Sequence, residues 1–133
     1  HEARGEALGI LEFVGLGKFM NLKATSLTLG RQKRLEFARA LATNPVLLLL
    51  DEVMAGLNPK EIDETIGLIR SVANRGVTIL VIEHVMKAIM SLSDYIIVIH
   101  HGEKIFEGKP QEVSKNEEVI RAYLGKEYKY AGR

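Results

Sequence analysis

Two carboxylates follow a short, uniformly apolar run of the sequence. Residues 46–50 are all aliphatic, and Asp51 and Glu52 come directly after them. A carboxylate at the end of a buried strand can hold a hydrated Mg²⁺ ion, and a second can orient or deprotonate water that attacks a phosphate. The same two residues could instead cap the strand and begin a turn, so this pair alone leaves both interpretations open.

A second apolar run, residues 77–82, ends in Glu83 and His84. A neutral imidazole at a strand end can exchange hydrogen bonds with a phosphate oxygen or with an attacking water. A single histidine after a strand is more often structural, and no second histidine follows at the helical spacing of a zinc site. We interpret His100 and His101 as solvent-facing residues of a turn.

A glycine-containing turn, residues 27–32 (LTLGRQ), precedes a predicted helix. The first N–H groups of a helix lack partners within it and carry a partial positive charge, which favours an anion. Gly30 permits close backbone approach, and Thr28 adds a hydroxyl. An ordinary helix start would show the same residues, so the turn alone assigns no ligand.

The elements that position these residues alternate between helices and strands. Apolar residues at helical spacing and capping signals predict helices at about residues 6–14, 30–42, 59–75, 85–92, 110–114 and 117–124. Apolar runs predict strands at 46–50, 77–82, 95–99 and 104–107. The first two have the pattern of strands covered on both faces of a parallel sheet, and the last two that of an edge hairpin. The order predicts an α/β fold.

The connections carry weaker signals. Residues 21–27 form a predicted linker in which Thr25 and Ser26 are the capping residues. Residues 125–133 form a polar tail that we expect to be frayed.

Composition excludes several classes of protein. The 133 residues are 47% hydrophobic and 26% charged, with a formal net charge of +1 and no cysteine. A disulfide framework and a thiolate metal site are therefore excluded, and no basic field favours nucleic acid. No stretch approaches the roughly 20 apolar residues of a membrane-spanning helix. The sequence opens at His1 without a signal peptide, so we expect a fragment or a processed product.

Four of these segments together resemble the ABC ATPases, in family order and at similar spacing. LTLGRQKRLEFARAL (residues 27–41) resembles the signature segment, and LLLLDE (47–52) resembles the Walker B strand. AGLN (55–58) falls at the D-loop, and His84 matches the switch histidine. The resemblance implies the C-terminal part of a P-loop NTPase domain, with a mostly parallel sheet, flanking helices and a C-terminal edge hairpin.

The resemblance also implies a role for each matched residue. Asp51 would hold Mg²⁺ through water, Glu52 would polarise the attacking water, and His84 would contact the γ-phosphate. The residues expected to contact ATP held by the opposite subunit, or to reach across to it, are Thr28, Leu29, Gly30, Arg31 and Asn58. The implied organisation is the end of a helical subdomain (1–44), part of the ATPase core (45–124) and the tail (125–133).

Some positions depart from the family pattern. Leu29 replaces a glycine, Arg31 a glutamine and Val53 a proline, while Val85 stands where an aspartate is usual. The 133 residues contain no G-x-x-x-x-G-K-[ST] loop, which would cradle the β- and γ-phosphates. We therefore expect these residues alone to be inactive.

A narrower resemblance links the chain to branched-chain amino acid importers. RLEFARALATNP, AGLNPKE, GVTILVIEH and VIRAYLG are similar to the ATPase subunits of those transporters. This implies an ATP-hydrolysing subunit that uses ATP and Mg²⁺ and pairs with a second ATP-binding subunit. It would be cytoplasmic, held at the inner face of the cell membrane by transmembrane permease subunits, without inserting itself and without binding nucleic acid.

Two alternatives belong to other classes. A DNA-repair or chromosome-maintenance ATPase has a related head, but such heads carry long coiled coils, and the chain shows no sustained heptads. The stretch GEKIFEGKPQEV also resembles transporters. A non-catalytic module that uses only the dimer-facing surface is the other alternative, and it suits the isolated 133 residues.

Overall fold

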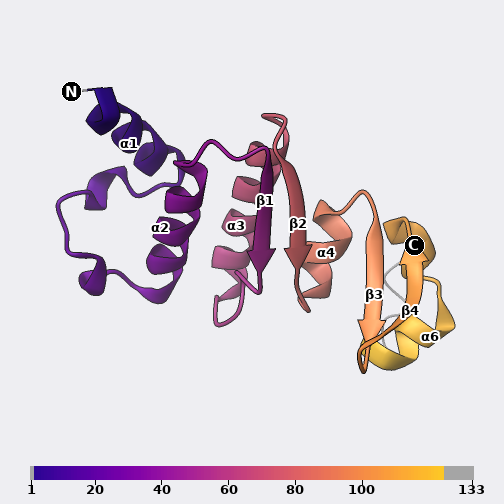
Figure 1. Cartoon of the computed structure of the whole chain (residues 1–133). Helices are drawn as coiled ribbons and strands as arrows, with labels where there is room; N and C mark the ends of the chain where they lie inside the picture. The colour runs from indigo at the N-terminus through magenta and orange to yellow at the C-terminus, as the bar shows by residue number, and fades with distance from the viewer. Residues whose placement is uncertain (1, 125–133) are drawn as a thin grey trace. The chain divides into compact units, whose positions relative to one another are not determined.

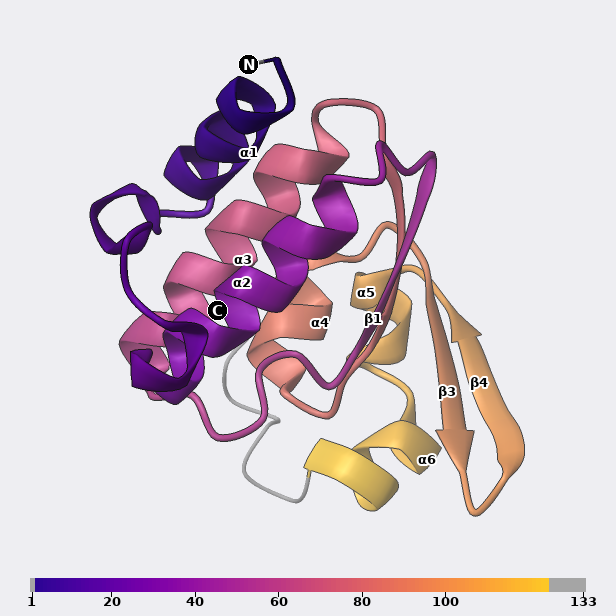
Figure 2. The ribbon, with the colours of Figure 1, turned by 60° about the vertical axis from the view of Figure 1, so that its left-hand side comes forward.

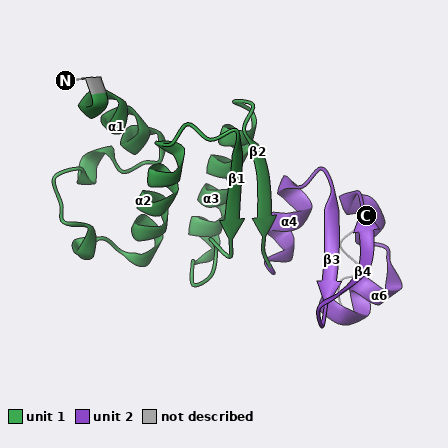
Figure 3. Ribbon diagram, in the orientation of Figure 1, with its two compact units in different colours: residues 1–83 green, residues 84–133 purple. Residues whose placement is uncertain are grey.

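Helices and strands alternate along the chain and build two units, residues 1–83 and 84–133 (Figure 3). The computed structural model describes residues 2–124 (Figure 1). The predicted tail, residues 125–133, lies outside the described residues. The elements of unit 1 are α1 (Glu2–Phe13), α2 (Leu29–Leu41), β1 (Leu47–Asp51), α3 (Pro59–Ala73) and β2 (Thr78–Ile82).

Strands β1 and β2 form a parallel pair, as the sequence predicted. Leu47 lies opposite Thr78, and the register continues without a shift to Asp51 opposite Ile82. The carboxyl ends of both strands therefore meet at one edge of the pair. Helix α3 makes the crossover between them and lies on one side of the strands in both views (Figures 1 and 2).

Within residues 2–124, only one face of this strand pair is packed. The buried apolar residues of unit 1 are Val14, Leu16, Phe37, Ala38, Leu48, Leu50, Met54, Ile66, Ile69 and Val72. The exposed apolar residues of the two strands are Leu47 (50%), Leu49 (64%), Leu80 (55%) and Ile82 (59%). The prediction that both strands are covered on both faces is therefore wrong here. Side chains alternate along a strand, and in the described residues helices cover one face only.

The start of α3 shows why its sequence predicted a helix so clearly. Asn58 Oδ1 accepts a hydrogen bond from the Glu61 N–H at 3.0 Å, and Glu61 Oε2 accepts one from the Asn58 N–H at 3.0 Å. This capping box satisfies two backbone donors that a helix end leaves without partners. Pro59 follows in the first turn, where its missing N–H costs nothing.

Two single 3₁₀ turns lead from α1 to α2, namely η1 (Gly17–Phe19) and η2 (Ala24–Ser26). The prediction that Thr25 and Ser26 cap the next helix is wrong, because both lie inside η2. Thr28 is the N-cap of α2, with an extended backbone and no capping hydrogen bond from its side chain.

Unit 2 begins at His84 and contains a hairpin with short helices. Strands β3 (Ile96–His100) and β4 (Glu103–Gly108) form an antiparallel sheet of their own. His101 (φ 48°) and Gly102 (φ 81°) connect them, and two consecutive positive φ angles suit a two-residue hairpin turn. The predicted hairpin is confirmed. The helical elements of this unit are α4 (Met86–Leu92), α5 (Pro110–Val113), α6 (Glu117–Val119) and the π-helical turn η3 (Ile120–Leu124).

The core of unit 2 is formed by Ala88, Ile89, Ile96, Val98, Val113 and Val119. Among the described residues, no helix of either unit is both long and apolar enough to cross a membrane.

Candidate functional site

The candidate site in unit 1 is built on residues 52–58, which leave the end of β1 and which we name the Glu52 loop. The Glu52 N–H donates to the carbonyl of Ile82 at 2.9 Å, and the Met54 N–H donates to Glu83 Oε1 at 2.8 Å. Met54 is 1% exposed, whereas Asp51 and Glu52 are both exposed. The end of β2 thus fixes the backbone of the loop and leaves the two carboxylates accessible.

Glu52 has an uncommon backbone conformation. Its φ angle is 47°, in the left-handed region, where a residue with a side chain is strained by about 1–3 kcal/mol and stays only if its surroundings hold it. A second element contributes to this support, because the Lys33 ammonium of α2 donates to the Glu52 carbonyl at 3.3 Å. Glu52, which the sequence predicts to be catalytic, therefore has a backbone conformation that neighbouring elements hold in place.

The second part of the site is the start of α2 with the two residues before it, residues 27–31, which we name the Thr28 turn. Thr28 and Leu29 are exposed, Leu29 to 52%, and Gly30 is buried. The Arg31 guanidinium lies 4.0 Å from the centre of the Phe19 ring, a cation–π distance. The turn therefore presents a hydroxyl, an apolar side chain and a cation on its surface.

The two parts lie against each other. A Cβ placed on Gly56 (φ 76°) would be 3.0 Å from Leu29 Cδ2, and one placed on Gly30 would be 2.6 Å from Glu61 Oε1. The space beside Gly30, where a side chain would otherwise lie, is therefore occupied by the Glu61 carboxylate. Seven of the eight predicted site residues belong to unit 1, in these two segments and at Asp51.

The junction between α2 and α3 is reinforced by charge. Arg34 of α2 forms an ion pair with Glu64 of α3, and both side chains keep part of their surface in water. Such a half-exposed pair contributes little free energy by itself. It links the two helices α2 and α3.

His84, the eighth predicted site residue, is the first residue of unit 2. Its side chain is exposed, and it lies two residues before α4. The other two described histidines of this unit stack at the hairpin, with ring centres of His100 and His101 4.1 Å apart. The ring of Tyr123 meets His100 edge-on at 5.7 Å, and its hydroxyl donates to the Ile99 carbonyl.

The donors at the end of β1 suit Mg²⁺ held largely by water. Within residues 2–124, no group of three or more acidic, histidine or cysteine side chains could hold a metal ion together. Mg²⁺ keeps several water ligands and needs only one or two carboxylates. Asp51, exposed at the strand end, is such a carboxylate.

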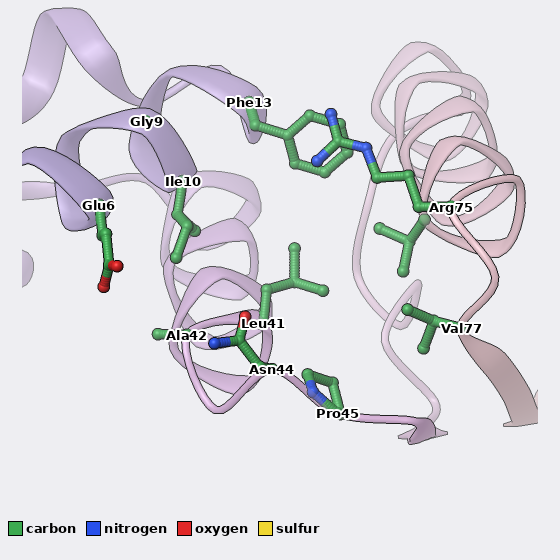
Figure 4. Close-up of a pocket in the computed structure, with 11 residues that line it drawn as sticks. Glu6, Gly9, Ile10, Phe13, Leu41, Ala42, Asn44, Pro45, Arg75 and Val77 are labelled. Atoms are coloured by element: carbon green, nitrogen blue, oxygen red, sulfur yellow. The ribbon is translucent and has the colours of Figure 1, made fainter.

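A cavity of about 480 Å³ lies elsewhere in unit 1, between the ends of α1, α2 and α3 (Figure 4). The guanidinium of Arg75 stacks on the Phe13 ring at its rim, 3.8 Å from the ring centre. Leu41 and Ala42 line it, so it lies at the end of α2 opposite the Thr28 turn. It contains none of the predicted site residues.

Sequence reasoning missed three residues that shape this site. Glu83 was noted only as the neighbour of His84, and Lys33 and Glu61 received no role. A signal existed for Glu83, because it ends a strand predicted to lie beside β1. Glu61 could have been found from the Asn-Pro-x-Glu spacing of a capping box.

Comparison with known proteins places the chain in a family. Residues 2–55 match the family described as "ABC transporter", and residues 103–129 match "Branched-chain amino acid ATP-binding cassette transporter". The high-affinity branched-chain amino acid transport ATP-binding protein BraF of Pseudomonas aeruginosa is 47% identical over 93% of this chain. The chain belongs to the ABC transporter ATP-binding proteins. The corresponding LivG protein of Salmonella typhimurium is also 47% identical over 93% of the chain.

The fold agrees with this family. A crystal structure of an ATP-binding cassette of an ABC transporter, in its ADP conformation, matches 94% of the chain with a TM-score of 0.84 and 31% identity. The predicted α/β class, as part of a P-loop NTPase domain, is therefore confirmed. The chain covers 51% of that structure and 49% of both BraF and LivG. It spans about half the length of the curated relatives it matches.

Proposed function

We propose that this chain forms part of the ATP-hydrolysing subunit of an importer for branched-chain amino acids. Support comes from the two matching family descriptions and from the names of BraF and LivG. The observation that carries the proposal is the packing of the Thr28 turn against the Glu52 loop in unit 1. The segments that resemble the family's nucleotide-binding motifs thus adjoin in one folded unit.

Each carboxylate at the end of β1 has a separate task in this proposal. MgATP, when bound, supplies the γ-phosphoryl group. The exposed Asp51 carboxylate would hold Mg²⁺ through water, and the Glu52 carboxylate would orient the attacking water and accept its proton. His84, after β2, would hydrogen-bond the phosphate. Phosphoryl transfer depends mostly on such positioning and on charge, so a constrained Glu52 backbone suits the task.

The Thr28 turn serves a neighbouring subunit in this proposal. Thr28, Leu29 and Arg31 are exposed, and they would contact ATP bound by a second ATP-binding subunit, together with the backbone at Gly30. Asn58 is exposed as well and would reach the same partner. Permease subunits would hold the pair at the cytoplasmic face of the membrane.

A hybrid protein tests the proposal. The stretch of BraF that matches this chain is replaced by the chain, and the hybrid is purified and checked for folding by circular dichroism. We expect MgATP hydrolysis that requires Glu52, and restored uptake of branched-chain amino acids in cells lacking BraF. A folded hybrid that hydrolyses no MgATP would contradict the enzymatic part. One that hydrolyses MgATP but restores no uptake would contradict the importer assignment.

A further inference from the structure

The carboxylate of Glu83 reaches from the end of β2 into the Glu52 loop. Its Oε1 atom accepts a hydrogen bond from the Met54 N–H at 2.8 Å. Glu83 is half-buried and Met54 is 1% exposed, so water competes poorly for this bond. A bond from a backbone N–H to a carboxylate is charge-assisted and stronger than one between neutral groups. Glu83 therefore holds a backbone atom two residues beyond Glu52.

The held atom lies close to the constrained point of the loop. Glu52 has φ 47°, and such a conformation persists only where the surroundings fix it. Before this point, the Glu52 N–H donates to the Ile82 carbonyl at 2.9 Å. After it, Met54 is tied to Glu83. The two bonds bracket the Cα atom of Glu52 and set the direction in which its side chain leaves the backbone.

We propose that Glu83 is a positioning residue for Glu52. The inference rests on the proposed function, in which the Glu52 carboxylate orients the attacking water. A misplacement of about 1 Å can lower a rate about 100-fold, so Glu83 affects turnover through the backbone of the loop. Glu83 also directly precedes His84, so the same bond anchors the chain that leads into the second predicted catalytic residue.

This role requires an acceptor oxygen at position 83 and not a negative charge. Glu83→Gln keeps an oxygen on a side chain of the same length, whereas Glu83→Ala removes the acceptor. Glu36→Ala is the matched control, because it removes an exposed carboxylate from α2, outside the Glu52 loop. The three variants separate loss of the hydrogen bond from loss of charge.

Amide hydrogen exchange of the 133-residue chain tests the anchor independently of catalysis. We expect Glu83→Ala to speed exchange of the Met54 amide about tenfold or more, relative to the buried Ile69 amide of α3. Glu83→Gln and Glu36→Ala keep the exchange within about threefold of the unmutated chain. Unchanged Met54 protection in Glu83→Ala overturns the proposal, and so does equally fast exchange in Glu83→Gln.

Steady-state kinetics of the BraF hybrid test the consequence for turnover. We expect Glu83→Ala to lower kcat about 10- to 100-fold while KM for MgATP stays within about twofold, and Glu83→Gln to retain most of kcat. A change in KM alone contradicts a positioning role, as does an unchanged kcat. An unmutated hybrid without hydrolysis refutes the proposed function instead, and the exchange measurement still decides whether Glu83 holds the loop.

Discussion

The Glu52 loop and the Thr28 turn adjoin each other, but they are held in different ways. The loop is fixed by hydrogen bonds from β2 and α2, namely to Ile82, Glu83 and Lys33. The turn is held by hydrogen bonds within its own stretch of the chain, where the Leu27 N–H donates to the Ala24 carbonyl and the Gln32 N–H donates to the Thr28 carbonyl. The Thr28 side chain makes no capping bond, and the Gln32 side chain donates to the Leu27 carbonyl at 3.0 Å. Leu29, at 52% exposure, projects from it.

This difference fits two different tasks. A group that orients water must be held before the reaction begins, because reorganisation during the reaction costs rate. A surface that binds a partner need only be exposed beforehand, because its side chains can become ordered when the partner binds. The comparison predicts that changes in the Glu52 loop act on chemistry and stability, and that changes in the exposed side chains of the Thr28 turn act mainly on association.

The largest expected effect concerns catalysis. In the BraF hybrid, Glu52→Gln should lower kcat about 100-fold or more, because an amide cannot accept the proton of the attacking water. Thr28→Val removes the hydroxyl that, in the proposed function, bonds ATP held by the second subunit. The loss of one such hydrogen bond should cost about 1 kcal/mol, or roughly fivefold in rate or affinity. Initial rates of phosphate release measure both. Equal losses in the two variants would remove the distinction between loop and turn.

A comparable contrast is expected in stability. Met54→Ala empties a site that is 1% exposed and should lower the free energy of unfolding by about 2–5 kcal/mol. Leu29→Ala truncates a side chain that is 52% exposed and should change it by about 0.5 kcal/mol or less. Urea denaturation followed by circular dichroism gives both values. A larger loss for Leu29→Ala would show that the turn belongs to the core.

Gly30 tests the contact between the Thr28 turn and the first turn of α3. A Cβ there would lie 2.6 Å from Glu61 Oε1, so Gly30→Ala must displace the Glu61 side chain. We expect a loss of about 1 kcal/mol, because the displaced carboxylate ends a flexible side chain but gives up its hydrogen bond from the Asn58 N–H. Gly67→Ala in α3 is the control, because a Cβ at Gly67 meets nothing within 4 Å. That variant should gain about 0.5–1 kcal/mol.

The smallest expected effect concerns the capping box at the end of the Glu52 loop. Asn58→Ala removes the side-chain acceptor of the Glu61 N–H and should cost about 1 kcal/mol. Asn58→Asp keeps an acceptor at the same position and should be close to neutral in stability. Thermal unfolding of the two variants checks this. An equal loss in both would mean that the cap contributes through something other than its acceptor.

Local signals in the sequence predicted most of the fold. The Asn58-Pro59 start located α3, and the apolar runs located β1 and β2 to within two residues at each end. The exposure of Leu49 could not be predicted in the same way. A uniformly apolar strand has the same sequence pattern whether one or both of its faces are covered within the chain. The pattern shows that the side chains are suited to burial, but it does not show which of them are buried.

The sequence predicted the side chains of the candidate site, but not the residues and the backbone conformation that hold them in place. Asp51 and Glu52 were found because carboxylates after an apolar run are conspicuous. Glu83 was not assigned as an anchor, because its partner is the backbone N–H of Met54, far away in the sequence and identical in every residue type except proline. The left-handed backbone of Glu52 leaves no mark in the sequence either, since that conformation is usually associated with glycine or asparagine.

The parallel pairing of β1 with β2 also leads us to expect an order of events in folding. All of α3 lies between the paired residues, so the ladder forms only after a long segment has closed. The backbone hydrogen bonds within helix α3 are local, so this helix can form earlier. Until closure, both apolar strand segments remain available to other chains, and such segments associate. We therefore expect the yield of refolding from urea to fall as the protein concentration rises.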